Sequence, residues 1–146
     1  MTFNFQLCAP QKVIFEGDVT HVALPGEEGD MVVLKNHTPI NTLVRTGVIH
    51  VGTEASKDRV FFVRGAALTV RSHGVRLLGE TVLDLETLDA ERLGKQLRAA
   101  EEDVHDAKTE LQKKITERKY KELKEIHDAL DQVQNHHHHY KPHKSS

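Results

Sequence analysis

The chain changes character near residue 86, and this change restricts its possible folds more than any other feature of the sequence. Eight of the nine glycines, all five phenylalanines and three of the four prolines lie in residues 1–86. Between Lys95 and Lys141 there is no glycine and no proline. Glycine and proline interrupt regular elements, whereas a long charged stretch without them favours helix. The sequence therefore predicts a β-module in residues 1–86 and a helical arm in residues 87–134.

Short stretches of alternating apolar and polar residues follow one another through the β-module. Residues 3–8 show this alternation clearly, which is the pattern of a half-buried strand. Turn signals recur about every 6–12 residues, and we expect turns at residues 16–18, 64–65 and 72–74. No spacing of the strand–helix–strand type is present, which argues against a parallel sheet. The pattern predicts a mainly β N-terminal antiparallel sandwich or flattened barrel of nine or ten strands.

The helical arm carries an apolar residue at every third or fourth position. Residues 87–135 hold 10 Lys/Arg and 12 Asp/Glu, so its other faces are densely charged and nearly neutral. Two narrow apolar stripes predict a C-terminal α-helical hairpin with its turn within residues 103–112, and they leave one long helix as an alternative. The stripes consist of Leu93, Leu97, Ala100 and Val104 in the first half and Leu123, Ile126 and Leu130 in the second.

Composition excludes several classes of function. The formal net charge of −2 gives no general attraction to nucleic acid, and Cys8 is the only cysteine, so no intrachain disulfide forms. No run approaches the roughly 20 apolar residues of a membrane span, which predicts no direct membrane insertion. The polar, His-rich segment 135–146 is expected to be a disordered tail. Its four adjacent histidines indicate a tolerated tail or a tag remnant, and no metal site is predicted.

No constellation in the chain argues for catalysis. The sequence contains no Gly-rich phosphate loop of the strand–helix type, no paired CxxC, no HExxH and no GxSxG. We therefore predict no catalytic residues and expect a protein that is not an enzyme. A β-module followed by a dockable arm is instead typical of a regulatory or coupling subunit.

An ordered set of segments gives the sequence a specific resemblance. Residues 15–17 form a Phe–x–Gly turn, residues 25–30 read Pro–Gly–Glu–Glu–Gly–Asp, and residues 37–39 read His–Thr–Pro. Val63–Gly65 and Leu88–Arg92 follow in the same order. Taken together, these segments resemble the epsilon subunit of the F-type proton-translocating ATP synthase, across essentially residues 3–133.

This resemblance implies a function as a non-catalytic rotor subunit of the central stalk. Members of that family bind the gamma subunit, stand on the ring of c subunits and couple proton translocation to ATP synthesis. Their C-terminal helices inhibit ATP hydrolysis when they extend into the alpha and beta catalytic subunits. The implied location is peripheral, on the cytoplasmic face of the bacterial inner membrane.

The resemblance also implies roles for particular residues. Asp30 and His37 fall where the family contacts the c ring, and Asp89 and Arg92 fall on its nucleotide-binding motif. Leu93 stands where that motif has alanine, so ATP is expected as a weak regulatory ligand at most and no other cofactor is implied. Basic residues of the second helix are expected to meet acidic loops of the catalytic subunits, or else to form a solvated face: Lys113, Lys114, Arg118, Lys119 and Lys121.

Three other interpretations compete with this one. The first is a β-sandwich adaptor with a coiled-coil interaction arm, unrelated to ATP synthase, which would self-associate through residues 88–133. The second is a metal-handling protein that uses the His-rich tail. The third is a small enzyme of the sandwich class, for which no residue pattern speaks.

Overall fold

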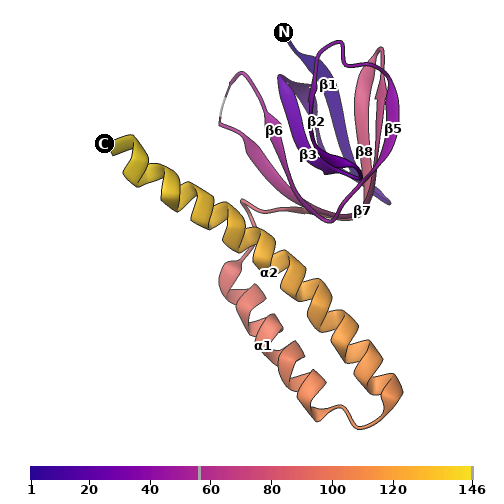
Figure 1. The fold of residues 1–146 in the computed structure, drawn as a ribbon, viewed down its shortest axis with the longest axis vertical. Coiled ribbons are helices and arrows are strands. Elements are labelled where there is room, and N and C mark those ends of the chain that lie inside the picture. The colour runs from indigo at the N-terminus through magenta and orange to yellow at the C-terminus, as the bar shows by residue number, and fades with distance from the viewer. Residues whose placement is uncertain (56, 146) are drawn as a thin grey trace. The chain divides into compact units, whose positions relative to one another are not determined.

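The structure is a computed structural model that describes the backbone of residues 1–55 and 57–145 and the side chains of residues 1–55 and 57–134. The chain divides into two compact units, Met1–Thr87 and Leu88–Ser146. The first is built of strands and the second of helices (Figure 1). The elements are β1 Phe3–Ala9, β2 Lys12–Val19, β3 His21–Gly26, β4 Gly29–Leu34, β5 Ile40–Val44, β6 Gly47–Gly52, β7 Arg59–Arg71, β8 Gly74–Asp84, α1 Ala90–Asp106 and α2 Glu110–Ser145.

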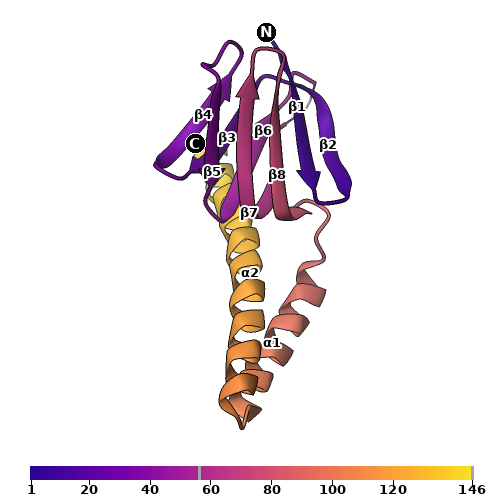
Figure 2. The ribbon, with the colours of Figure 1, turned by 90° about the vertical axis from the view of Figure 1, so that its right-hand side faces the viewer.

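The strands of the first unit form a two-layered sandwich, which confirms the predicted fold class (Figures 1 and 2). They pair in the order β2-β1-β8-β7-β5-β3-β4, and β6 pairs with both β3 and β7. All pairs are antiparallel except β1 with β8, which run parallel from Phe5 beside Val75 to Cys8 beside Leu78. The predicted α-helical hairpin is confirmed as well, because α1 and α2 pack against each other.

The described residues contain eight strands rather than the nine or ten predicted. Two expected turns are in fact strand: residues 16–18 lie inside β2, and residues 64–65 lie inside β7. The predicted hairpin at residues 72–74 is confirmed, because Arg71 pairs directly with Gly74. The sequence pattern does not predict strand β5, because only Val44 among its residues is buried and its sequence therefore shows no apolar face.

Gly65 explains why the sequence pattern predicts two strands where the structure has the single strand β7. Its φ of 62° is the left-handed conformation that glycine adopts easily. Pairing with β8 is interrupted between Arg64 and Ala66, and a Cβ at Gly65 would lie 2.6 Å from Oε2 of Glu80. The strand therefore kinks without ending. Its first half pairs with β6 and its second half with β5.

The apolar core lies between the two layers of the sandwich. No described polar or charged side chain is buried. Of the buried apolar side chains described, only Leu93, Ala100, Ala129 and Leu130 belong to the helical unit. The largest side chains that are fully buried all come from the strands: Phe5, Phe61, Phe62, Leu7, Ile49, Leu68 and Leu77.

Capping contacts fix where the helices begin. The turn between them covers residues 107–109, inside the predicted range, so the arm is a hairpin and not one long helix. Thr109 Oγ1 accepts from the backbone N–H of Gln112 at 3.1 Å, while Gln112 Oε1 accepts from the backbone N–H of Thr109 at 3.3 Å and from that of Lys108 at 2.9 Å. This reciprocal pattern is a capping box, which starts α2 without glycine or proline. The disorder expected of residues 135–146 stays a prediction, since their side chains lie outside the described residues.

Candidate functional site

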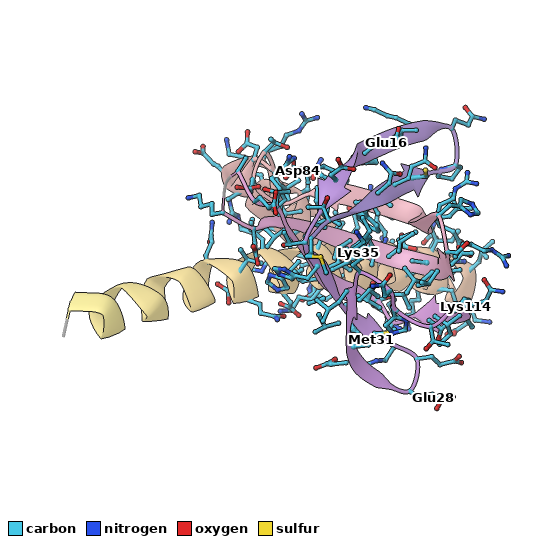
Figure 3. The ribbon with its side chains drawn as sticks, turned by 90° about the horizontal axis from the view of Figure 1, so that it is seen from above. Glu16, Glu28, Met31, Lys35, Asp84 and Lys114 are labelled. Atoms are coloured by element: carbon cyan, nitrogen blue, oxygen red, sulfur yellow. The ribbon has the colours of Figure 1, made fainter. Side chains whose placement is uncertain are left out.

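An acidic turn joins β3 to β4. The strands pair as far as Gly26 and Gly29, so only Glu27 and Glu28 form the loop. Their side chains and that of Asp30 are exposed, and Glu28 lies at the tip of the hairpin (Figure 3). Gly29 has a φ of 142°, and a Cβ on Gly26 would lie 2.9 Å from the carbonyl oxygen of Gly29. The turn therefore requires both glycines, and its exposed carboxylates lie on a tight two-residue hairpin.

Arg45, directly after β5, holds this turn in place. Its Nη2 donates to Oδ1 of Asp30 at 2.9 Å, and its Nε donates to the carbonyl oxygen of Gly26 at 2.9 Å. Its backbone N–H donates to the carbonyl oxygen of Pro25 at 2.8 Å. No local sequence pattern predicts this role of Arg45, because Asp30 and Gly26 lie 15 and 19 residues away in the chain.

A shallow depression of about 670 Å³ lies beside the acidic turn. The turn forms one rim, and strand β5 and part of β7 form the other walls. Leu43 in this wall is 58% exposed and Ile40 is 39% exposed, so apolar surface is available next to three carboxylates. A mixed acidic and apolar surface of this kind suits contact with a protein loop better than a buried small molecule.

His37 lies in the loop that follows β4. Its backbone N–H donates to the carbonyl oxygen of Leu34 at 3.1 Å, and Nδ1 lies 2.7 Å from the carbonyl oxygen of Thr38. A carbonyl oxygen only accepts, so Nδ1 carries the proton and Nε2 is left to meet another group. Asn36, with a φ of 70°, turns the chain back immediately before it.

The structure does not bring His37 and Asp30 together. Asp30 pairs with Pro25 at the first end of β4, whereas Leu34 pairs with His21 at the other end, and His37 lies beyond it. A strand of six residues spans roughly 20 Å at about 3.3 Å per residue. The two predicted contact residues therefore mark two separate places on the sandwich.

The other predicted pair, Asp89 and Arg92, lies at the start of α1. Asp89 is the N-cap residue, and its Oδ1 accepts from the backbone N–H of Arg92 at 3.1 Å. The carboxylate therefore stabilises the helix terminus, which is a sufficient reason for its presence. Leu93 is only 4% exposed, while Arg92 is exposed. Of the two, the Arg92 side chain is the one available to an anion.

The first half of α2 presents a basic and apolar surface. Leu111 is 68% exposed and Ile115 is 59% exposed. The basic residues exposed beside them are Lys113, Lys114, Arg118, Lys119 and Lys121. Two of the basic side chains pair within the helix, Lys113 with Glu110 at 4.0 Å and Arg118 with Glu122 at 3.7 Å. Exposed pairs of this length contribute little to stability, so the surface stays open to a partner.

Neither a metal centre nor a membrane span is found in the described part of the chain. No group of three or more His, Cys, Asp or Glu side chains there is arranged to hold a metal ion. The histidines of the tail lie outside the described side chains. None of the described helices is long and apolar enough to cross a membrane.

Comparison with known proteins decides between the interpretations. The sequence model described as "ATP synthase, Delta/Epsilon chain, beta-sandwich domain" matches residues 2–84. The chain belongs to the ATP synthase delta/epsilon family. It is 36% identical over 127 residues to the ATP synthase epsilon chain of Parvibaculum lavamentivorans, covering 87% of this chain and 96% of that one. The epsilon chain of Maricaulis maris is 37% identical over 107 residues, covering 73% and 80%.

Solved structures of ATP synthases share the fold of this family member. A chain of the Euglena gracilis mitochondrial enzyme, in an assembly of OSCP, F1 and c-ring, superimposes with a TM-score of 0.69 at 22% identity, covering 90% of this chain and 81% of that one. A chain of the Tetrahymena thermophila central stalk and c-ring gives 0.56 at 14% identity, covering 89% and 97%. The family model and the epsilon-chain relatives confirm the resemblance to the epsilon subunit, and with it the expectation of a synthase subunit that is not itself an enzyme. An adaptor unrelated to the synthase is ruled out.

Proposed function

We propose that the chain is a rotor subunit of the central stalk of a bacterial F-type ATP synthase, where it couples proton translocation through the c ring to ATP synthesis. The observation that carries this proposal is that the match extends over both units: 87% of the chain aligns with an epsilon chain, and 90% superimposes on a chain of an ATP synthase assembly. By this proposal the subunit is peripheral, on the cytoplasmic face of the inner membrane, and needs no cofactor.

The acidic turn supports a contact with the polar loops of the c ring. A subunit that transmits torque must keep its contact groups in fixed positions, and Arg45 ties Asp30 and the carbonyl of Gly26 to the end of β5. His37 lies at the other end of β4, beyond the reach of the same short loop. We infer that Asp30 and His37 serve separate contacts, with Asp30 on the c ring.

Exposed apolar side chains on β4 and β5 support a contact with the gamma subunit. Val32 is 52% exposed and Leu34 is 55% exposed, and both point away from the core because Val33 between them is buried. Leu43 on β5 adds a third exposed apolar group. Because β4 lies at the edge of the sheet, a partner reaches this surface without displacing a strand.

The arm is proposed to inhibit ATP hydrolysis by reaching the alpha and beta subunits. Its apolar stripes are narrow, so its helices gain only modest stability from any one docking surface, which suits a switch between two states. The basic surface of α2 fits acidic loops of the catalytic subunits. ATP is expected to favour one arm position weakly at most, since Asp89 is engaged as a helix cap.

The test of the c-ring contact is Asp30→Lys in the complete synthase reconstituted in vesicles. We expect proton-driven ATP synthesis to fall clearly, while the stability of the subunit falls only modestly, because the exposed pair with Arg45 that is lost contributes about 0.5 kcal/mol. Asp18→Lys, at an exposed acid on β2, is the matched control and should leave synthesis unchanged.

The double variant Asp30→Arg with Arg45→Asp separates two explanations. It restores an ion pair at the turn but places the negative charge on the other residue. If synthesis returns, the turn needs only its internal bond and the c-ring contact is refuted. If synthesis stays low in the double variant but persists in Arg45→Asp alone, which also loses the bond to Gly26, the partner contacts the negative charge at position 30. A pull-down with gamma completes the test, since failure to bind gamma would refute the stalk assignment.

A further inference from the structure

Arg59, the first residue of β7, binds two acidic residues in the segment that leads from the sandwich to the arm. Its Nη2 donates to Oδ2 of Asp84 at 2.9 Å, and its Nε donates to Oε1 of Glu86 at 3.0 Å. Its guanidinium carbon also lies 5.6 Å from the ring centre of Phe15 and 5.3 Å from that of Phe61. One planar cation therefore bonds two carboxylates and contacts two rings, which the single ammonium of lysine cannot reproduce.

Backbone bonds hold the same segment. The N–H of Leu85 donates to the carbonyl oxygen of Val60 at 3.1 Å, and the N–H of Glu86 donates to Oδ1 of Asp84 at 3.0 Å. The N–H of Thr87 donates to the carbonyl oxygen of Asp84 at 3.3 Å. Each residue of the exit segment, residues 84–87, thus makes a hydrogen bond either to β7 or to another residue of the segment.

The Arg59 contacts are less exposed than the ion pair of Arg45 with Asp30. The side chain of Asp84 is 19% exposed, and those of Arg59 and Glu86 are 36% and 38% exposed, whereas Asp30 in the Arg45 pair is 90% exposed. Partial burial strengthens a charged hydrogen bond because less water competes for it. The β-module therefore fixes the exit segment more firmly than its own acidic turn.

We propose that Arg59 is a positioning residue that clamps residues 84–87 to the sandwich and confines the freedom of the arm to the backbone at Leu88. Helix α1 is already capped by Asp89, so Leu88 alone lies between the exit segment and the capped helix. A pivot of one residue limits the directions in which the arm can swing. The use of this pivot in regulation rests on the proposed switching of the arm, whereas the clamp itself is a property of the isolated chain.

The experiment is amide hydrogen exchange on the full chain, measured by NMR for Leu85 and Glu86. In Arg59→Gln we expect both amides to exchange at least about tenfold faster, the factor that corresponds to about 1.4 kcal/mol of local stability. Arg64→Gln is the matched control, because Arg64 is on the same strand and its guanidinium carbon lies 5.2 Å from the ring centre of Phe62. It should leave the exchange at Leu85 and Glu86 unchanged.

Several outcomes would overturn the clamp. Unchanged exchange at Leu85 and Glu86 in Arg59→Gln would refute it. An equal acceleration at amides of β1 would also refute it, because it would mean a general loss of stability. If Arg59→Gln does not fold, Glu86→Gln removes one carboxylate and should accelerate exchange at residues 85–87 alone, and failure to do so refutes the clamp. ATP hydrolysis by the assembled synthase is the separate readout. If the clamp is released and hydrolysis does not change, the use of the pivot in regulation is refuted and the clamp stands.

Discussion

Replacing Arg45 should destabilise the sandwich more than replacing its ion-pair partner Asp30. The Asp30 carboxylate is 90% exposed and the Arg45 side chain is 54% exposed, so their pair is worth about 0.5 kcal/mol. The second bond of Arg45, from Nε to the carbonyl of Gly26, is partly buried. A charged donor to a carbonyl contributes about 1.5 kcal/mol, which we reduce to about 1 for partial exposure. Asp30→Asn should thus cost about 0.5 kcal/mol and Arg45→Gln about 1.5 kcal/mol.

Thermal unfolding followed by circular dichroism distinguishes the two effects. For a unit of the size of Met1–Thr87, each kcal/mol shifts the Tm by about 4–8 °C, so we expect losses of about 2–4 °C for Asp30→Asn and about 6–12 °C for Arg45→Gln. The smaller loss should disappear in about 1 M salt, because exposed charges are screened there. Arg71→Gln, at an exposed arginine of β7, is the control. Equal losses in the two variants would refute the reasoning, because the bond to Gly26 would then contribute nothing.

Three further predictions concern the modules and the arm. Residues 1–86 expressed alone should be folded, show a cooperative thermal transition and bind gamma, since they retain the strand core and the Arg59 contacts. An unfolded fragment would contradict this. Deleting residues 88–146 should raise ATP hydrolysis by the soluble catalytic complex or leave it unchanged, and should not abolish synthesis; lowered hydrolysis would mean that the arm is structural. The hydrogen bond from Lys124 to Asp128, and then the charge of Asp128, raise the pKa of Lys124 above its ordinary value of 10.5. The pair therefore stabilises α2 fully below about pH 10.5, and this stabilisation is lost as the pH rises through the higher pKa of the folded state. Asp128→Asn should remove this alkaline loss of helicity, measured by circular dichroism.

Much of the fold could be predicted because local patterns determine it. Strand β1 alternates cleanly, and the apolar stripe at Leu93, Leu97, Ala100 and Val104 has helical spacing, so both elements were found. The predicted turn at Gly65 was wrong, because a glycine within an apolar pattern usually marks a turn, whereas here its positive φ only kinks a continuous strand. Strand β5 has a mostly exposed sequence, and it exists because β7 on one side and β3 on the other offer it partners.

The candidate site was less accessible from sequence. The acids of the turn are visible in the sequence because they lie within four residues of one another, but Arg45, which pairs with Asp30, is linked to it only by the folded chain. Arg59 was missed for the same reason, since Asp84 and Glu86 lie 25 and 27 residues away. The cap at Asp89 is a local feature, because an aspartate directly before a helical stripe favours the helix N-terminus, and its carboxylate accepts from the N–H of Arg92.

The kinked strand β7 has a mechanical consequence. Two sheets held together only by apolar side chains can slip past each other, because such contacts have no fixed direction. Here β7 pairs first with β6 and then with β5, and both of these strands pair with β3 on the other side. Any sliding of one layer over the other would have to stretch a continuous polypeptide and shear hydrogen bonds at both junctions. The sandwich therefore resists torsion, because the continuous strand β7 belongs to both layers. A load applied at one layer reaches the other through its covalent backbone.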